Sequence, residues 1–510
     1  MDIKRLSVYS DAIRPIYGPS SSHTYAPAKI AYHAASSFAE IGKGKTEVEV
    51  VFVGADSDMP FKGHASDKAI IGGMLMLDPD SEEFAKTREL VPRKAIDTIQ
   101  VDEFPNVSFR FFIDKDPKKK IELEKKKAAF GIYIRIEEAD RMMEVTGTSL
   151  GGGNVNIEEM KSRKGSETFS DLFLEVDHPG YLVTETGWNA LERTEYNVQT
   201  FEQLVDLATI KGKRICDIAI EREAIIAPRS TRAEIFAYMK RNWKIMEKNM
   251  NEGLTGDFRG ELSSKTAESL QKFVAKSNDK YQETCARAVA VSLVGASMGR
   301  IVSCPTAGSA GILPAVAYTV SQEPGMSENM VVESMFTAGI IALLVKARVS
   351  VSGMQHGCEA ECGVGRAMAA ALETEMRGGN PRQVVNAASR AIVESLGLPC
   401  DPIGGLVEVP CVERNGACAV AAHNDATMGL ADFGIVPIEE VLQVMDQVGK
   451  DLKDDYKEGK NGAHGLAGTP TGLRLSENLQ TTSPRYKIPY REINDAKRAD
   501  IAGRIRYFRT

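Results

Sequence analysis

The period of the hydrophobic pattern changes once along this chain, and that change limits the folds open to it. Up to about residue 155, short runs alternate between apolar and polar residues, as half-buried strands do; they lie near 47–54, 95–104, 107–114 and 129–137. From about residue 200, apolar residues recur at the helical period of 3.6, in segments from 200–209 to 437–453. The pattern predicts an α+β N-terminal domain followed by a larger all-α domain.

The length of the chain also favours several domains, because 510 residues exceed one ordinary core. We expect residues 1–155 to form the α+β domain and residues 196–455 the all-α domain. Residues 156–195 are polar and are expected to form an irregular linker. Residues 456–510, rich in glycine and proline, are expected to form a C-terminal tail.

Charge and hydropathy make several classes of partner unexpected. The net charge of −7 gives no electrostatic reason to expect nucleic acid or an anionic membrane. The most apolar run, Met335 to Val345, is shorter than the ~20 residues that a membrane span needs. The first residues lack the apolar stretch of a signal peptide, and the eight cysteines are too unevenly spread for a disulfide framework. We therefore expect a cytoplasmic protein.

Five of the eight cysteines gather between residues 356 and 418, and most of them lie beside glycine or proline. Cys358 follows His-Gly, Cys400 lies in Leu-Pro-Cys-Asp-Pro-Ile-Gly-Gly, and Cys411 lies in Val-Pro-Cys-Val-Glu-Arg-Asn. Turns let several thiolates aim at one point, and glycine lets the backbone approach a bulky inorganic centre. No Cys-x-x-Cys pair is present, so the residues alone leave two interpretations open: a metal site or buried small apolar side chains.

Two stretches rich in hydroxyl groups precede predicted helices. Residues 18–24 read Gly-Pro-Ser-Ser-Ser-His-Thr and precede a helix expected from Pro27 to about Ile41, and residues 303–311 open a second helix. Such stretches can bind an anion such as a carboxylate, or they can simply cap the helix. His64 lies in a glycine-flanked loop, where a surface histidine is the plain alternative.

Together these motifs resemble the iron–sulfur-dependent L-serine dehydratases, in a single-chain form with β and α regions fused. The resemblance covers the chain from about residue 6 to about residue 453. It rests on five motifs: Gly18–Thr24, Lys62–Asp67, Ser149–Asn154, the Pro-Thr-Ala-Gly stretch of residues 305–308, and the three cysteine turns with their spacings of 42 and 11 residues. The second motif departs mildly from the family pattern at Ala65 and Ser66.

The resemblance implies an oxygen-sensitive [4Fe-4S] cluster in the all-α domain, bound by Cys358, Cys400 and Cys411, with one iron left open as a Lewis acid for the substrate. It implies elimination of water from L-serine, without pyridoxal phosphate, to give aminoacrylate and then pyruvate and ammonia. His64 and His23 are the implied catalytic residues, and His64 is favoured for removing the Cα proton. The implied substrate-binding residues are Ser20, Ser21, Ser22, Thr24, Lys62, Asp67, Thr306 and Gly308. Cys362 matches no ligand position and is interpreted as structural.

Other functions stay open on the sequence. A related cluster-dependent lyase acting on L-threonine or L-cysteine would share these motifs, and so would an inactive amino-acid-sensing binding protein. A pyridoxal-phosphate enzyme is disfavoured by the all-α cysteine half. We expect a homodimer. Some relatives carry a tail cysteine that approaches the cluster, but this chain has no cysteine after Cys418.

Overall fold

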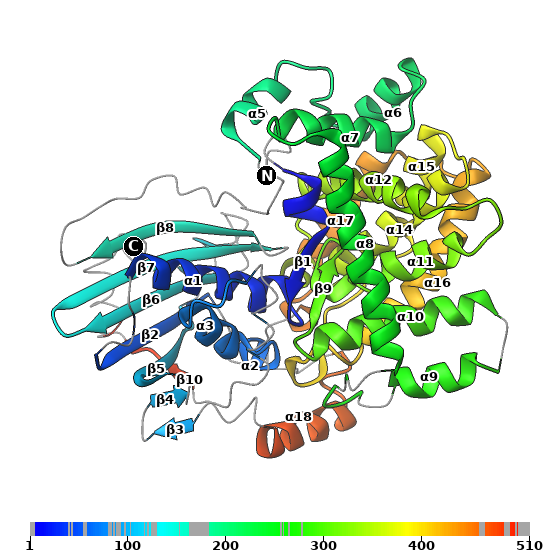
Figure 1. Cartoon of the computed structure of the whole chain (residues 1–510). Helices are drawn as coiled ribbons and strands as arrows, with labels where there is room; N and C mark the ends of the chain where they lie inside the picture. The colour runs from blue at the N-terminus through cyan, green and yellow to red at the C-terminus, as the bar shows by residue number, and fades with distance from the viewer. Residues whose placement is uncertain are drawn as a thin grey trace. The chain divides into compact units, whose positions relative to one another are not determined.

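The structure is a computed structural model of the chain (Figure 1). It describes residues 6–38, 41, 44–54, 59–79, 84, 87, 93–95, 98–101, 104–116, 118–119, 122–123, 130–151, 154–162, 183–255, 258, 260–263, 266–276, 279–457, 465–483, 490–494 and 497. Part of the predicted tail, and residues 152 and 153 of the Ser149 motif, lie outside the described residues.

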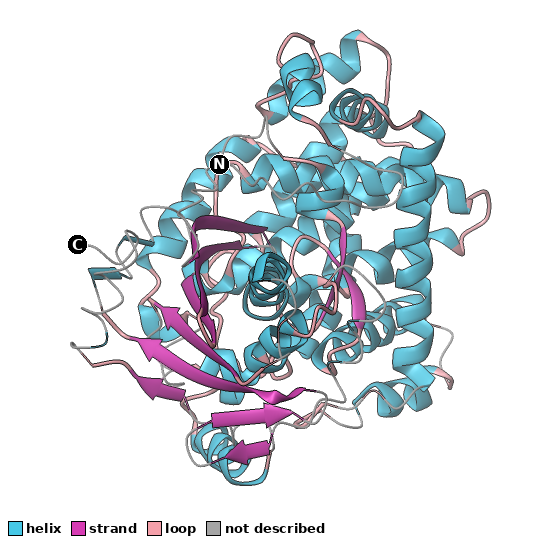
Figure 2. Ribbon diagram, turned by 60° about the vertical axis from the view of Figure 1, so that its left-hand side comes forward, coloured by secondary structure: helices cyan, strands magenta, loops and turns pink. Residues whose placement is uncertain are grey.

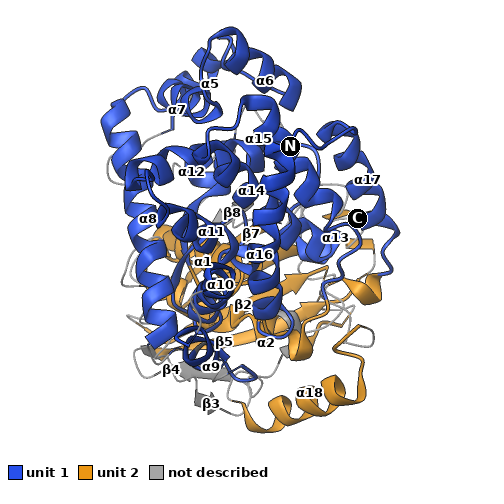
Figure 3. Cartoon of the chain, turned by 90° about the vertical axis from the view of Figure 1, so that its right-hand side faces the viewer, with its two compact units in different colours: residues 1–16, 174–400, 408–453 blue, residues 17–173, 401–407, 454–510 orange. Residues whose placement is uncertain are grey.

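The chain divides into two compact units (Figure 3). The helical unit comprises residues 1–16, 174–400 and 408–453, and the sheet unit comprises residues 17–173, 401–407 and 454–510. The predicted fold class is therefore confirmed: an N-terminal region with a sheet and helices is followed by a larger helical region. The continuous domain ranges given above stay a prediction.

The sheet unit is built on one eight-stranded sheet (Figure 2). Along the sheet the strands follow the order β3-β4-β5-β2-β6-β7-β8, and β10 pairs with β5. Their bounds are β2 Thr46–Val53, β3 Arg93–Ala95, β4 Thr98–Val101, β5 Phe104–Asp114, β6 Phe130–Glu138, β7 Arg141–Gly151, β8 Asn154–Ser162 and β10 Tyr490–Glu492. The central strand β2 runs parallel to β5 and antiparallel to β6.

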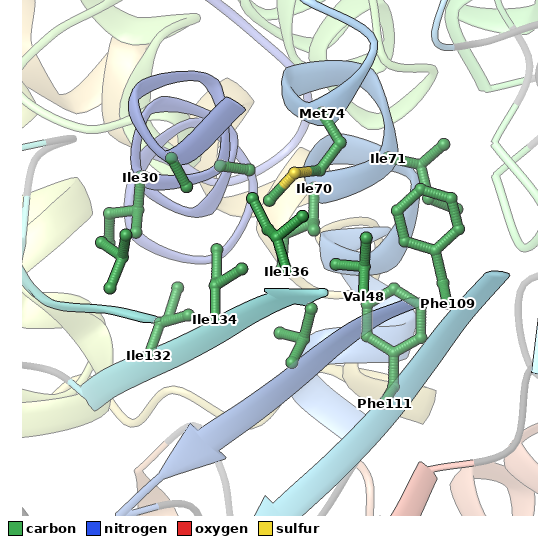
Figure 4. Close-up of a cluster of buried hydrophobic side chains, with 14 of the residues drawn as sticks. Ile30, Val48, Ile70, Ile71, Met74, Phe109, Phe111, Ile132, Ile134 and Ile136 are labelled. Atoms are coloured by element: carbon green, nitrogen blue, oxygen red, sulfur yellow. The ribbon is translucent and has the colours of Figure 1, made fainter. Parts of the chain in front are cut away.

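The core of this unit lies between the sheet and helices α1 (Ala26–Phe38) and α3 (Ser66–Met74). Figure 4 shows Ile30 from α1 and Met74 from α3 above Val48 and Ile134 of the sheet. Alternate residues of β2 and β6 supply this face, which is why their sequence pattern predicted strands.

Several elements were not predicted, among them strands β7 and β8 and helix α5. Strand β7 pairs with β6, and β8 pairs with β7 along its whole length. Strand β8 and helix α5 (Glu185–Leu191) both fall in the range predicted as an irregular linker, so that prediction is wrong for these residues. Val155 and Ile157 of β8 alternate with polar residues and pack against the core, but six of the nine residues of β8 are polar, so the apolar pattern is too short to predict the strand from sequence.

The helical unit contains a helix in every segment that the pattern predicted. The bounds are α6 Phe201–Ile210, α7 Ile215–Ile226, α8 Arg232–Thr255, α9 Thr266–Val274, α10 Lys280–Ala296, α11 Ile312–Ser321, α12 Glu328–Lys346, α14 Val364–Met376, α15 Pro381–Val393, α16 Cys411–Leu430 and α17 Ile438–Asp451. Strand β9 (Arg300–Ser303) follows α10 in sequence. It pairs with β1 (Arg14–Tyr17), near the start of the chain, in a two-stranded sheet.

Helix α12 corrects the expectation that the most apolar segment is too short to span a membrane. Its 19 residues, with a mean hydropathy of 1.5, make it long and apolar enough to cross a membrane by length and composition. The helix is longer than the apolar run in the sequence because it begins at Glu328, before Met335, and includes Val331 and Val332. However, 78% of the 18-residue window that meets this criterion is buried inside the protein, as in the core helix of a soluble protein.

Candidate active site

The turns that carry Cys358 and Cys400 contact each other in the helical unit. Gly357, directly before Cys358, has a φ of 75°, and a Cβ atom added there would lie 2.5 Å from the Leu398 carbonyl oxygen. The Glu359 backbone N–H donates to the same oxygen at 3.2 Å. Glycine is therefore required here, because the two turns approach too closely for any side chain.

Arg414 joins these two turns to the third. It lies in the first turn of α16, which begins at Cys411, and its Nη1 donates to the Pro399 carbonyl oxygen at 2.6 Å. Its guanidinium also hydrogen-bonds Cys358. One cation thus contacts the Cys358 side chain and the backbone next to Cys400, and its own helix begins with Cys411.

The surroundings of Cys358 favour its thiolate. Hydrogen bonding from Cys362, together with the charge of Arg414, lowers the pKa of the buried Cys358 thiol to about 7, although burial alone would raise that pKa. The thiolate is the form of cysteine that binds iron. Cys411 lies at a helix N-terminus, where the helix dipole favours a negative charge.

Asn415 connects the third cysteine turn to the stretch that contains Thr306 and Gly308. Its Nδ2 donates to the Cys411 carbonyl at 2.9 Å and to the Gly308 carbonyl at 2.6 Å. Its Oδ1 accepts from the Gly311 backbone N–H at 3.0 Å. The residues predicted from sequence in this unit therefore lie in contiguous turns.

The donor set of these turns is of the kind that a thiolate-bound cluster needs. Cys358, Cys400 and Cys411 supply three free thiols, and thiolates are the ligands that hold iron–sulfur clusters. Among the described residues, no group of three or more His, Cys, Asp or Glu side chains could hold one metal ion.

Cys362 lies closer to this region than its structural interpretation implied. Its side chain hydrogen-bonds both Cys358 and Cys418, and these contacts raise the pKa of Cys362 well above its usual value. Its Sγ lies 3.9 Å from the Gly308 carbonyl oxygen, which accepts its S–H. Cys362 is therefore a thiol whose single S–H faces three acceptors.

Thr306 is buried, and its hydroxyl is used within its own loop. Its Oγ1 lies 3.1 Å from the Ser309 hydroxyl, which in turn donates to the Cys304 carbonyl at 2.8 Å. Gly308 is half-buried, and a Cβ atom there would lie 2.8 Å from the Glu361 carboxylate. Sequence reasoning did not select Glu361. Its position three residues after Cys358 was the available signal.

The sheet unit brings the two candidate histidines together. The rings of His23 and His64 have centroids 4.8 Å apart, and both residues are fully buried. The Thr24 hydroxyl donates to the His64 carbonyl at 2.7 Å, and the Ser66 hydroxyl donates to the His23 carbonyl. The Gly18–Thr24 and Lys62–Asp67 motifs therefore form one assembly. The alternative of a surface histidine is wrong for His64.

The serines of the first motif cap their own turn. The Ser20 hydroxyl accepts from the His23 backbone N–H at 3.1 Å, and the Ser22 hydroxyl lies 2.9 Å from His23 Nδ1. Ser21 is buried in the same turn. Capping and anion binding both stay open for these residues. Lys62 is half-buried at the end of the short helix α2 (Met59–Gly63), and Asp67 is buried in the first turn of α3.

The loop of His64 also packs against the segment 401–407 of the same unit. A Cβ atom on Gly63 would lie 2.2 Å from the Gly405 carbonyl oxygen. The Asp401 carboxylate accepts from the Leu466 backbone N–H at 2.7 Å, just before helix α18 (Pro470–Thr482). Part of the predicted tail therefore holds the residues that follow Cys400 in sequence.

Two family models match this chain in tandem. The model described as the serine dehydratase beta chain matches residues 11–160, and the one described as the serine dehydratase alpha chain matches residues 210–465. These matches define a lyase that carries both regions in one chain.

Curated relatives agree with the family models. L-serine dehydratase TdcG of Escherichia coli is 31% identical over 88% of this chain and 96% of its own length. L-serine dehydratase of Haemophilus influenzae is 29% identical over 91% of this chain and 98% of its own. The probable L-serine dehydratase alpha chain of Bacillus subtilis is 35% identical over 54% of this chain and 94% of its own. The chain belongs to the L-serine dehydratase family.

Proposed function

We propose that this protein is an L-serine dehydratase that depends on a [4Fe-4S] cluster and not on pyridoxal phosphate. Cys358, Cys400 and Cys411 would hold the cluster. The observation that carries the proposal is the junction at Arg414, which hydrogen-bonds Cys358 and the backbone next to Cys400 from the helix that Cys411 begins.

Dehydration of serine poses two chemical problems. The Cα proton is weakly acidic, and hydroxide is a poor leaving group. When bound, the cluster supplies a Lewis acid for the leaving hydroxyl group. The protein must then supply a base for the Cα proton and contacts that hold the substrate carboxylate. The product, aminoacrylate, tautomerises and hydrolyses to pyruvate and ammonia.

We assign proton removal to His64 and substrate binding mainly to the Gly18–Thr24 turn. Support comes from burial, because a fully buried imidazole beside the ring of His23 is held in one orientation by packing. The Thr24 hydroxyl further fixes the His64 backbone. Ser20, Ser21 and Ser22 would bind the carboxylate, and Thr306 stays a further proposed substrate-binding residue.

The cluster assignment is tested on protein purified without oxygen. Iron, sulfide and visible absorption are measured for the wild type, for Cys400→Ser and for Cys285→Ser, a half-buried cysteine on α10 that is not a predicted ligand. We expect iron and sulfide with a serine-perturbed absorption band in the wild type and the Cys285→Ser control, and loss of all three in Cys400→Ser. Full iron content and turnover in Cys400→Ser would refute the assignment.

The substrate and the base need separate measurements. Rates with L-serine, L-threonine and L-cysteine distinguish water elimination from a sulfide-releasing lyase, and metal-free, colourless wild-type protein would favour an amino-acid-binding protein. For the base, His64→Ala should slow turnover and keep or enlarge the Cα deuterium isotope effect. His33→Ala, on the outer part of α1, should leave both unchanged. Loss of the isotope effect in His64→Ala would count against His64.

A further inference from the structure

Glu361 differs from its neighbours on the turn that follows Cys358. The turn Glu359–Gly363 is buried almost throughout: Glu359 and Cys362 are each 1% exposed. Glu361 alone in it is half-buried. A carboxylate with partial access to solvent therefore lies within a buried turn next to a proposed cluster ligand.

Two glycines show where the Glu361 carboxylate lies. A Cβ atom on Gly353 would lie 3.0 Å from both Glu361 Oε2 and Cys400 Sγ. The carboxylate oxygen and the proposed ligand sulfur are consequently no more than about 6 Å apart, twice that distance. On another side, a Cβ on Gly308 would lie 2.8 Å from Glu361 Oε2. Side chains at either glycine would displace the carboxylate, because such contacts are shorter than van der Waals distance.

The chemistry of serine sets what must lie at such a position. The substrate carries an ammonium group, and its nitrogen is only three covalent bonds from the hydroxyl oxygen that has to leave. Any residue that binds the ammonium must therefore lie within a few ångströms of the group that receives the hydroxyl. An ammonium that leaves water needs a charged acceptor, because burying it unpaired is costly.

We infer that the Glu361 carboxylate binds the α-ammonium group of the substrate and so selects amino acids over hydroxy acids. The inference rests on the proposed function, since it takes Cys400 as a cluster ligand. Gly308, selected from sequence as a substrate-binding position, keeps the space beside this carboxylate open. Glu361 is a substrate-binding residue in this assignment, not the base.

Glu359 provides a matched control on the same turn. Its carboxylate accepts from the Gly397 backbone N–H at 2.5 Å and so serves the packing of the two cysteine turns. Replacing either glutamate with glutamine removes one negative charge near Cys358 and keeps the side-chain size. Only Glu361→Gln should change how the protein treats the substrate ammonium.

The test uses anaerobically purified holoenzyme and two ligands that cannot eliminate. L-Alanine keeps the ammonium and lacks the leaving group, whereas L-lactate also lacks the leaving group and has a hydroxyl group in place of the ammonium. Calorimetric titration gives their dissociation constants for the wild type, Glu361→Gln and Glu359→Gln. A hydrogen bond to a charged group is worth about 1.5–3 kcal/mol, equivalent to a roughly 10- to 150-fold change.

We expect Glu361→Gln to weaken the binding of L-alanine by about that factor and the binding of L-lactate by less than about twofold. Glu359→Gln should preserve the ratio of the two constants. The assignment would be overturned if Glu361→Gln weakened the binding of both ligands equally, or if it left the affinity for L-alanine unchanged and lowered kcat. Failure of the wild type to bind iron or turn over L-serine would instead overturn the proposed function, so the two failures are distinguishable.

Discussion

Replacing Glu408 with alanine is expected to loosen the turn that carries Cys411. The Glu408 carboxylate is buried three residues before that cysteine. It accepts hydrogen bonds from the backbone N–H groups of Glu261, Leu262 and Ser263 at 2.9, 2.8 and 3.1 Å, and from the Ser263 hydroxyl at 2.9 Å. One side chain therefore ties the entrance of the Cys411 turn to a separate loop.

The size of the effect follows from the burial of the donors. Glu261 is exposed and Leu262 is half-buried, so water can replace the carboxylate at these two positions at little cost. Ser263 is buried and presents two donors. A buried donor left without an acceptor costs about 1–3 kcal/mol, so losing the acceptor of both donors should make opening of this loop easier by about 2–6 kcal/mol in Glu408→Ala. That corresponds to a roughly 30- to 25,000-fold shift in the opening equilibrium.

Hydrogen exchange at the amides of Leu262 and Ser263 measures the opening directly, and iron release to a chelator without oxygen measures its effect on the cluster. Both should accelerate in Glu408→Ala. Glu439→Ala is the matched control, because Glu439 also caps a backbone N–H, that of Phe201 at 2.8 Å, at the start of α6. Unchanged exchange at residues 262 and 263 would refute the energetic reasoning. Faster exchange with unchanged iron release would refute the link to Cys411.

Three further outcomes are expected. Hydrogen bonding from Arg377 lowers the pKa of the partly exposed Glu323 to about 2, so the stability that this carboxylate contributes is complete above about pH 4.5 and is lost as the pH falls toward 2. Glu323→Gln should therefore reduce thermal stability at pH 7, by about 1 kcal/mol, and flatten its acid dependence. Arg414→Gln should raise the pKa of Cys358, so alkylation of metal-free protein by iodoacetamide at pH 7 should slow several-fold. Asp401→Asn should weaken the contact with the tail, which limited proteolysis between residues 457 and 483 would detect.

Much of the helical unit could be predicted because its buried helices have a strongly apolar sequence pattern. Helix α12 is apolar at nearly every position from Val331 to Val345, and such a segment has few alternatives to a central helix. Strand β2 alternates over Thr46–Val53 because one of its faces packs on α1 and α3. These elements are defined by their own residues.

Elements defined by their neighbours were predicted less well. Strand β8 pairs with β7, and six of its own nine residues are polar. The apolar period predicts a helix over 416–430, but α16 begins five residues earlier, at Cys411, because its first turn contains charged residues and follows a proline. The acidic residue in that turn, Glu413, is a usual N-terminal signal and would have indicated the earlier start.

The site residues also divide into those that the sequence could indicate and those that only the structure shows. The three cysteines and His64 were selected by resemblance, since no periodicity relates residues 42 positions apart. The contact of His23 with His64 depends on two loops that are distant in sequence, and their geometry comes from the sheet unit as a whole. Glu361 was missed because a carboxylate between two polar or small residues looks like a solvated turn in sequence.

Helix α16 makes the cysteine turns and the Gly308 stretch depend on one another. Arg414 and Asn415 are consecutive, yet they point to different partners: Arg414 reaches Cys358 and Pro399, and Asn415 reaches Gly308. Consecutive helical residues face about 100° apart, so the rotation of α16 that satisfies one of them fixes the other. The proposed ligand Cys358 and the Gly308 stretch, a proposed substrate-binding loop, are held by the same helical turn and cannot shift independently. On the proposed function, this shared support would keep cluster ligands that are far apart in sequence in a fixed geometry relative to the substrate.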